Sequence, residues 1–365
     1  MDNKKYFLFY PLSLLYRLIT DIRNKLYDTG ILSSRKISLP LICVGNITVG
    51  GTGKTPHTEY ISDLLRTNYK VAVLSRGYRR KTKGFLEVKG SQMSTESGDE
   101  PLQIALAFPD ILVAVDGNRV RGAEKIIESH PDTEVIILDD AFQHRSIRAG
   151  LSILLTDFNR LISRDHLLPY GRLREKWTNA GRADILIVTK TPADLTVTEM
   201  EEIRKELKIK PSQSLFFTST TYQDPLPVFA DCHEILRLNE ADKYRMGAVL
   251  VTGIASHVPF KLYLQKYIGN IIHLQFPDHH YFSRKDIAMI EEALGSLTSP
   301  RKLILTTSKD AVRLTEFTNI ASPMKEVFFY IPVGISFVGE GKMRFDKIIL
   351  DYVGKNHKNR PVPQV

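Results

Sequence analysis

Apolar residues along the first part of the chain follow two different periods. Between residues 7 and 25 they recur at helical spacing, with Arg17, Asp21 and Asn24 on another face, which is the pattern of an amphipathic helix. Farther on they form short, uninterrupted runs that indicate strands buried on both faces of a parallel sheet. These runs cover residues 39–44, 71–74, 111–115, 135–138, 151–155 and 185–188.

Stretches with helical character separate several of these runs, at residues 55–66, 102–108 and 119–129. The alternation predicts an α/β fold, a doubly wound and mostly parallel sheet, over residues 29–225. A segment with Pro225 and Pro227 follows, and after it come further apolar runs at 248–252, 270–274, 303–305 and 327–331. We therefore expect a second, smaller α/β domain over 226–350 and a flexible tail over 351–365.

The chain has 365 residues and a formal net charge of +9. An excess of basic residues suits an anionic partner such as a nucleotide, an acidic lipid or a nucleic acid. Nucleic acid is disfavoured, because no basic stripe with interleaved aromatic residues is present. Cys43 and Cys232 are far apart and belong to no CxxC pair. The cysteines therefore indicate no disulfide framework or zinc site, and a reducing cytosol fits best.

The helix expected in residues 1–28 has too short an apolar stretch to span a bilayer, because Arg17 interrupts it. No small-residue cleavage site follows the stretch, so we expect no export. Its apolar stripe fits a helix that lies in a membrane interface, although a helix packed on a domain core has the same pattern.

A glycine-rich stretch, VGNITVGGTGKTP at residues 44–56, follows the first apolar run and precedes a helix. This context is that of a phosphate-binding loop, in which backbone amides point at phosphate oxygens. The alternative is a glycine-rich turn of structural purpose. Thr48 stands where the strict GxxxxGK[ST] pattern has glycine. The residues predicted to hold the nucleotide are Thr48, Val49, Gly50, Gly51, Thr52, Gly53, Lys54 and Thr55.

The run VIILDD at residues 135–140 ends in two acids. In a P-loop protein, an acid at the end of a neighbouring strand completes the Mg²⁺ site with the loop threonine. Thr55, Asp139 and Asp140 are therefore the candidate metal residues. Acids at a strand end can also cap the next helix.

The sequence also indicates which nucleotide, ATP or GTP, the loop would bind. Guanine-specific P-loop proteins carry an N/TKxD element, and here Thr189 and Lys190 are followed by Thr191 and Pro192 without the acid. The other candidate for this element is at residues 308–310, where Lys309 and Asp310 are adjacent and not one residue apart as the element requires. The predicted nucleotide is therefore ATP, with Mg²⁺.

Seven motifs in a fixed order closely resemble the tetraacyldisaccharide 4'-kinase family of lipid A biosynthesis. The resemblance runs from the N-terminal helix to about Val312. The motifs are GNITVGGTGKTP (45–56), LSRGYRR (74–80), SGDEP (97–101), DDAFQHR (139–145), LPYGRLRE (168–175), FPDHH (276–280) and TSKDAVR (307–313).

The resemblance implies a P-loop α/β domain joined to a smaller α/β domain, with the substrates meeting between them. It implies transfer of the γ-phosphate of ATP to the 4'-hydroxyl of tetraacyldisaccharide 1-phosphate, which gives lipid IVA. The implied place is the cytosolic face of the inner membrane of a Gram-negative bacterium, with the N-terminal helix on the membrane surface.

By the same resemblance, Asp99 matches the family's catalytic base and His279 its partner. The residues alone favour a helix N-cap before Pro101 as the role of Asp99, and the resemblance reverses that preference. His279 and His280 lack a second cluster at the spacing of zinc ligands. Other candidates in or near the motifs are Arg76, Arg119, Gln143, His144, Arg174, Glu175, Lys309 and Asp310.

The chain departs from the family pattern at Tyr170, Arg172 and Lys176. These departures affect the contacts of one loop. A rival reading of the P-loop and the helix is a membrane-associated ATPase switch that acts on a protein partner, which would need no base for a sugar hydroxyl.

Overall fold

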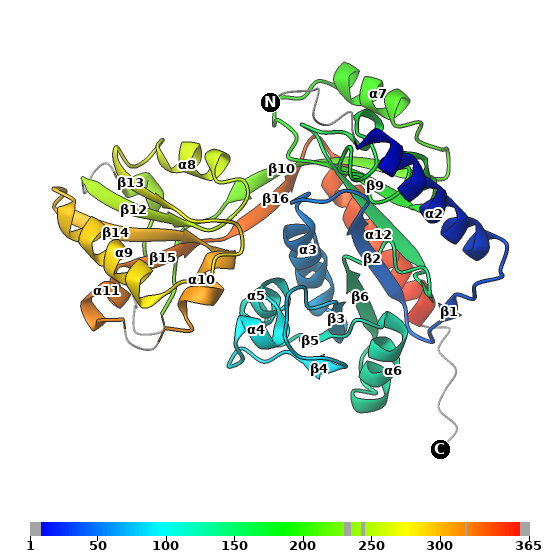
Figure 1. The fold of residues 1–365 in the computed structure, drawn as a ribbon, viewed down its shortest axis with the longest axis horizontal. Coiled ribbons are helices and arrows are strands. Elements are labelled where there is room, and N and C mark those ends of the chain that lie inside the picture. Colours follow the sequence, from blue (N-terminus) through cyan, green and yellow to red (C-terminus); the bar gives the residue numbers. More distant parts are fainter. Residues whose placement is uncertain (1–8, 230–234, 242–244, 318–319, 358–365) are drawn as a thin grey trace.

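The computed structural model describes residues 9–229, 235–241, 245–317 and 320–357. The larger of its sheets has nine strands (Figure 1), and all neighbours are parallel except at its two edges, where β16 and β4 are antiparallel. Across the sheet the order is β16 (Val333–Phe337), β10 (Ser214–Tyr222), β9 (Ile185–Thr189), β8 (Leu151–Asp157), β2 (Leu41–Asn46), β6 (Val135–Asp139), β3 (Val71–Ser75), β5 (Leu112–Val115) and β4 (Leu86–Glu87).

Helices cover both faces of this sheet, because its central strands carry apolar side chains on both sides. Ile61, Leu102 and Phe345 pack on one face, and Ile126 and Ile203 pack on the other. The predicted doubly wound α/β fold is confirmed. The first face carries α3 (Lys54–Arg66), α5 (Asp99–Ala107) and α12 (Gly341–His357), and the second carries α6 (Arg119–Ser129) and α7 (Val197–Glu206).

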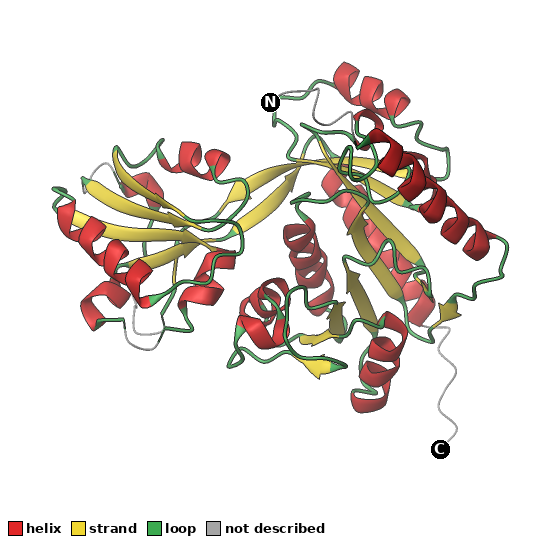
Figure 2. Ribbon diagram, in the orientation of Figure 1, coloured by secondary structure: helices red, strands yellow, loops and turns green. Residues whose placement is uncertain are grey.

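A second sheet of five strands lies beside the first (Figure 2). Phe260 of α8 packs on one face, and Ile290 of α9 and Leu314 of α10 pack on the other. The strand order is β11 (Leu226–Pro227), β15 (Phe328–Ile331), β14 (Arg301–Thr307), β12 (Met246–Thr252) and β13 (Asn270–Gln275). The helices are α8 (Val258–Leu264), α9 (Arg284–Ser296), α10 (Ser308–Leu314) and α11 (Ser322–Glu326).

The remaining regular elements are short. The pair β1 and β7 forms a separate small parallel ladder. These elements are β1 (Arg35–Lys36), β7 (Ile147–Arg148), α4 (Ser94–Ser97), η1 (Ile162–Arg164), η2 (Trp177–Arg182) and η3 (Leu238–Glu240).

The chain returns to the first sheet after the second one, which the sequence pattern did not predict. Strand β16 pairs with β10 from Thr218 opposite Phe337 to Tyr222 opposite Val333. The Tyr352 hydroxyl on α12 donates to the Leu41 carbonyl at 3.0 Å. The expected domain over 226–350 is therefore wrong from β16 onward, and the expected flexible tail is helical up to His357. The rest of that tail, 358–365, lies outside the described residues.

Helix α2 (Tyr10–Asp28) packs with its polar side against the protein. Its buried residues are Ser13 and Asn24, and the Ser13 hydroxyl donates to the Leu167 carbonyl at 3.1 Å. The helix begins and ends three residues later than the spacing predicted. Within the described part of the chain, no helix is long and apolar enough to cross a membrane.

Candidate active site

The glycine-rich segment forms a tight loop between β2 and α3. Gly50 has φ of 108° and Gly53, the N-cap of α3, has φ of 82°. Both values lie in the left-handed region that side chains with a Cβ disfavour. A Cβ added at Gly50 or Gly51 would meet no atom within 4 Å, so the surface of the loop is open. The loop therefore offers an uncovered helix N-terminus to an anion.

Contacts from β2 and from the end of β9 hold this loop on one side. The Asn46 amide donates to the Thr52 hydroxyl at 2.7 Å, and the Thr189 hydroxyl donates to the Thr52 carbonyl at 2.9 Å. Lys190 Nζ donates to the Gly51 carbonyl at 2.6 Å. Thr189 and Lys190, which no guanine-reading acid follows, therefore hold the phosphate loop in place.

The LPYGRLRE segment holds the loop on its other side. The Val49 amide donates to the Arg172 carbonyl at 2.9 Å, and Arg174 donates its backbone N–H to the Ile47 carbonyl at 2.7 Å. Thr48 is buried and pairs with Leu173 as an isolated antiparallel bridge. The position where the strict motif has glycine therefore serves as a strand-like contact here.

Gln143 and Glu175 contact each other next to the end of β2, where the phosphate loop begins. Gln143 Nε2 donates to the Asn46 carbonyl at 2.7 Å and lies 3.2 Å from Glu175 Oε1. Glu175 is buried and accepts hydrogen bonds from Asn24 of α2 and from Arg182. These two candidates therefore connect the loop to α2 within the protein.

The two acids at the end of β6 lie beside the loop lysine. Asp139 is buried, which raises the pKa of its carboxyl, and it accepts from the Thr58 hydroxyl at 3.2 Å. Asp140 Oδ1 lies 3.7 Å from Lys54 Nζ, and Arg174 Nη1 lies 3.3 Å from Asp140. Burial alone would raise the pKa of Asp140, but Lys54 and Arg174 lower it. No helix begins directly after Asp140, so neither acid caps one.

This donor set fits Mg²⁺. The ion prefers oxygen ligands and is commonly held by one or two carboxylates together with substrate phosphates. Within the described residues no group of three or more His, Cys, Asp or Glu side chains forms a metal cage. Thr55 at the start of α3 and the two acids at the end of β6 would hold the ion, and phosphate oxygens and water would supply its other ligands.

Asp99 and His279 meet between the two sheets, although they lie 180 positions apart. His279 Nδ1 lies 2.9 Å from Asp99 Oδ2. Asp99 is the first residue of α5, and the N-cap position is Gly98 with no side-chain cap, so the N-cap alternative is wrong. Burial would raise the pKa of Asp99, but hydrogen bonds from His279 and Arg313 lower it to about 2.

Helix α10 supplies the groups around this pair. Lys309 Nζ lies 3.3 Å from His279 Nε2 and 3.5 Å from Glu100. Asp310 is buried and accepts from the Gly253 amide at 2.9 Å and from the Thr307 hydroxyl at 2.7 Å.

Arg313 was not among the predicted site residues, although it is 1% exposed and its guanidinium contacts both Asp99 and Asp310. The sequence offered one indication of this role. Arg313 ends the TSKDAVR motif three positions after Asp310, a spacing that places both side chains on the same face of a helix.

Arg119 and His144 lie near the two acids at the end of β6, and Arg76 lies near both of them. Arg119 is buried and donates to the Asp116 carbonyl at 2.5 Å and the Asp139 carbonyl at 3.3 Å, and burial lowers its pKa to about 10. Burial lowers the pKa of His144 to about 4. Arg76 is exposed at the end of β3.

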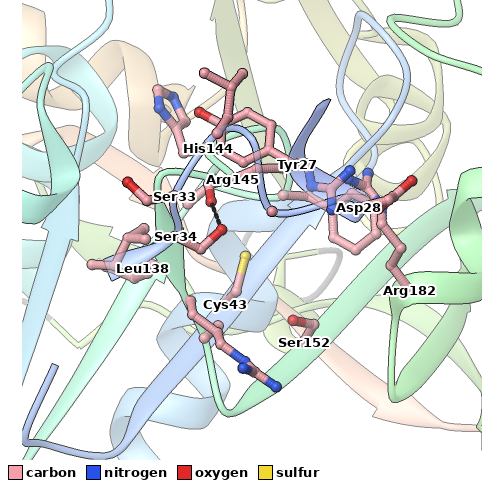
Figure 3. Close-up of a pocket in the computed structure, with 17 residues that line it drawn as sticks. Tyr27, Asp28, Ser33, Ser34, Cys43, Leu138, His144, Arg145, Ser152 and Arg182 are labelled. Atoms are coloured by element: carbon pink, nitrogen blue, oxygen red, sulfur yellow. Dashed lines mark hydrogen bonds and ion pairs between the residues drawn. The ribbon is translucent and has the colours of Figure 1, made fainter. Parts of the chain in front are cut away.

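Two open pockets lie near His144. The first has a volume of 640 Å³, and Figure 3 shows Ser34 joined to Arg145 by a hydrogen bond at its wall. The second has a volume of 860 Å³ and includes Arg119. Neither is lined by residues 48–55, and Ser33 and Ser34, which follow α2, line both.

The family model described as tetraacyldisaccharide-1-P 4'-kinase, LpxK, matches residues 5–353. The chain belongs to this family. A curated tetraacyldisaccharide 4'-kinase from Bacteroides thetaiotaomicron is 43% identical over 96% of this chain and 94% of its own length. The corresponding protein from Phocaeicola vulgatus is 45% identical over 96% of each chain.

A solved structure supports the same assignment. It is the crystal structure of LpxK from Aquifex aeolicus in complex with ATP, which is similar to the chain with a TM-score of 0.74 and 29% identity. The similarity covers 95% of this chain and 99% of that one. The resemblance read from the motifs is therefore confirmed.

Proposed function

We propose that this chain transfers the γ-phosphate of ATP to the 4'-hydroxyl of tetraacyldisaccharide 1-phosphate and so makes the lipid A precursor lipid IVA. The observation that carries the proposal is the pairing of Asp99 with His279 between the two sheets. A switch ATPase needs a phosphate loop and a metal site but no such pair.

The phosphate loop would hold the donor. Amides of Gly50, Gly51 and Gly53 would bind the phosphate oxygens, and Lys54 would leave Asp140 to contact the β- and γ-phosphates. Thr55, Asp139 and Asp140 would hold Mg²⁺, which when bound neutralises charge on the transferred group.

Asp99 would accept the proton of the sugar hydroxyl. Its pKa of about 2 keeps it ionised at neutral pH, and its hydrogen bond with His279 fixes its orientation. Lys309 would donate to His279 Nε2, so that Nδ1 carries the proton that faces Asp99. Arg76, which is exposed after β3, is the candidate for the anionic part of the lipid acceptor.

We also propose that α2 places the enzyme on the cytoplasmic face of the inner membrane. Its outward side carries a stripe of leucine and isoleucine side chains that are exposed among the described residues. Leu15, Leu18, Ile19 and Ile22 are 56%, 56%, 58% and 51% exposed. An apolar stripe that faces away from the protein suits the interface of a bilayer.

Replacing Leu15, Leu18, Ile19 and Ile22 together by glutamine is expected to weaken vesicle binding by about tenfold or more, because each buried aliphatic side chain contributes on the order of 1 kcal/mol. Co-sedimentation with phospholipid vesicles measures the effect. Val197 of α7, which is 76% exposed, provides the control Val197→Gln. Unchanged vesicle binding by the quadruple variant, with the same thermal stability as the parent, would contradict the anchor.

The purified protein is expected to move label from γ-labelled ATP to tetraacyldisaccharide 1-phosphate in detergent with Mg²⁺. Chromatography of the extracted lipid measures the transfer. Reactions without lipid or without Mg²⁺ serve as controls. ATP hydrolysis that leaves the lipid unlabelled would contradict the kinase proposal and would favour a switch ATPase.

A further inference from the structure

A buried arginine, Arg313, contacts Asp99 of the Asp99–His279 pair. It lies on α10, a helix that packs on the second sheet. Its side chain is 1% exposed. Burying a guanidinium is costly unless carboxylates and carbonyls take its hydrogen bonds. The partners of Arg313 therefore indicate why a charge is kept in the interior.

The Arg313 guanidinium connects two carboxylates: Asp99 on α5, which packs on the first sheet, and Asp310 on α10, which packs on the second. Nη2 donates to Asp99 Oδ2, at the start of α5. Nη1 donates to Asp310 Oδ1 at 3.2 Å and lies 3.4 Å from the His280 carbonyl. Asp310 Oδ2 is held in turn by the Gly253 amide. The guanidinium is therefore fixed from the second sheet and extends its other nitrogen to the first.

The two oxygens of Asp99 have different surroundings. Both His279 and Arg313 contact Oδ2, whereas no donor from the described residues reaches Oδ1. His279 Nδ1 and Arg313 Nη2 also lie 3.2 Å apart. With the proton on Nδ1, both groups donate to the same oxygen of Asp99. The carboxylate is therefore held by Oδ2, and Oδ1 is the oxygen left for a hydroxyl.

We propose that Arg313 is a positioning residue of the kinase reaction: from the second sheet it anchors Oδ2 of Asp99, so that Oδ1 is aimed at the acceptor hydroxyl only while the two sheets are in contact. This proposal rests on the proposed function, because it assumes that Asp99 is the base. In this proposal the last residue of the TSKDAVR motif, Arg313, orients the base, and Asp310 of the same motif holds the guanidinium in place.

The test combines four variants with one control. R313M removes the charge but keeps much of the volume, R313K keeps a point charge that cannot bridge both carboxylates as a planar fork does, and D99N and D99N/R313M complete a double-mutant cycle. R121M is the matched control, because Arg121 binds Asp116, another buried carboxylate, at 2.8 Å. Turnover, KM for ATP and thermal stability are measured for each.

We expect R313M to lower kcat by about 10- to 100-fold with little change in KM for ATP, because a misplaced base slows the chemical step. R313K is expected to lie between R313M and the parent. In the D99N background R313M should cause little further loss, since it acts through Asp99. R121M should keep the parent's kcat.

Three results would overturn the proposal: a normal kcat in R313M, the same fractional loss with and without Asp99, or a fall in kcat matched by a fall in ATP affinity. If R313M does not fold, R313K carries the test, and a normal kcat in R313K overturns the proposal. Failure of the unmodified protein to label the lipid would instead contradict the proposed function, before any variant is compared.

Discussion

Asp99→Asn is expected to lower kcat for lipid phosphorylation by about 10²–10⁴-fold, the range that a general base contributes. Asparagine has nearly the shape of aspartate but cannot accept the proton of the hydroxyl. Asp99 lies at the start of α5 and forms ion pairs with His279 and Arg313, whereas Lys54 pairs with Asp140. ATP affinity should therefore stay near that of the parent, and the labelled-phosphate assay together with equilibrium ATP binding measures both quantities.

A second carboxylate–histidine pair provides the control for this variant. Glu87 and His130 lie 2.9 Å apart in the first part of the chain, and both are about one-third exposed. Glu87→Gln removes the same kind of contact and should leave kcat unchanged. Turnover by Asp99→Asn within a few-fold of the parent would show that another group takes the proton.

Most strands of the two sheets were predictable because they contain an uninterrupted apolar run between polar turns, whereas β4, β10, β11 and β16 were not predicted. The run at 135–138 is β6, and the run at 248–252 lies within β12. Burial on both faces of a parallel strand leaves this record in the sequence itself. The phosphate loop was predictable for a related reason, since the left-handed turns at Gly50 and Gly53 require glycine.

Which sheet a strand joins is a different matter, because pairing depends on long-range contacts. β16 follows the second sheet along the chain but pairs with β10 of the first. Its residues, Val333–Phe337, alternate apolar side chains with Gly334 and Ser336. Such alternation is typical of a half-buried strand but does not indicate which strand it pairs with. The domain boundary was therefore misplaced, although β15, the strand just before β16, was predicted.

The same limit applies to side chains of the site. Asp99 and His279 were named from the resemblance, and their contact depends on the packing of α5 against α10. Lys190 was assessed only as part of a missing guanine element, and its contact with the Gly51 carbonyl depends on β9 lying next to β8 in the sheet. Local spacing indicates residue types that suit a reaction, whereas their meeting depends on topology.

Lys54→Ala is expected to lower kcat by at least about 100-fold, the order of the loss when one preorganised donor to developing charge is removed, and to weaken ATP binding as well. The lysine Nζ lies 3.7 Å from Asp140 and its side chain is 11% exposed, so its charge acts in a partly desolvated site. Equilibrium binding of ATP and the labelled-phosphate assay measure the two effects.

A double variant separates two reasons for that loss. Removing Lys54 also takes away one of the cations that act on Asp140, which keeps its contact with Arg174, and the less compensated negative charge would repel ATP. If this repulsion were the whole effect, Asp140→Asn would restore ATP binding to Lys54→Ala when Mg²⁺ is chelated. We expect no such recovery, because the lysine itself contacts the phosphates. Lys347→Ala, at a lysine 75% exposed on α12, controls for the loss of one positive charge and should bind ATP normally.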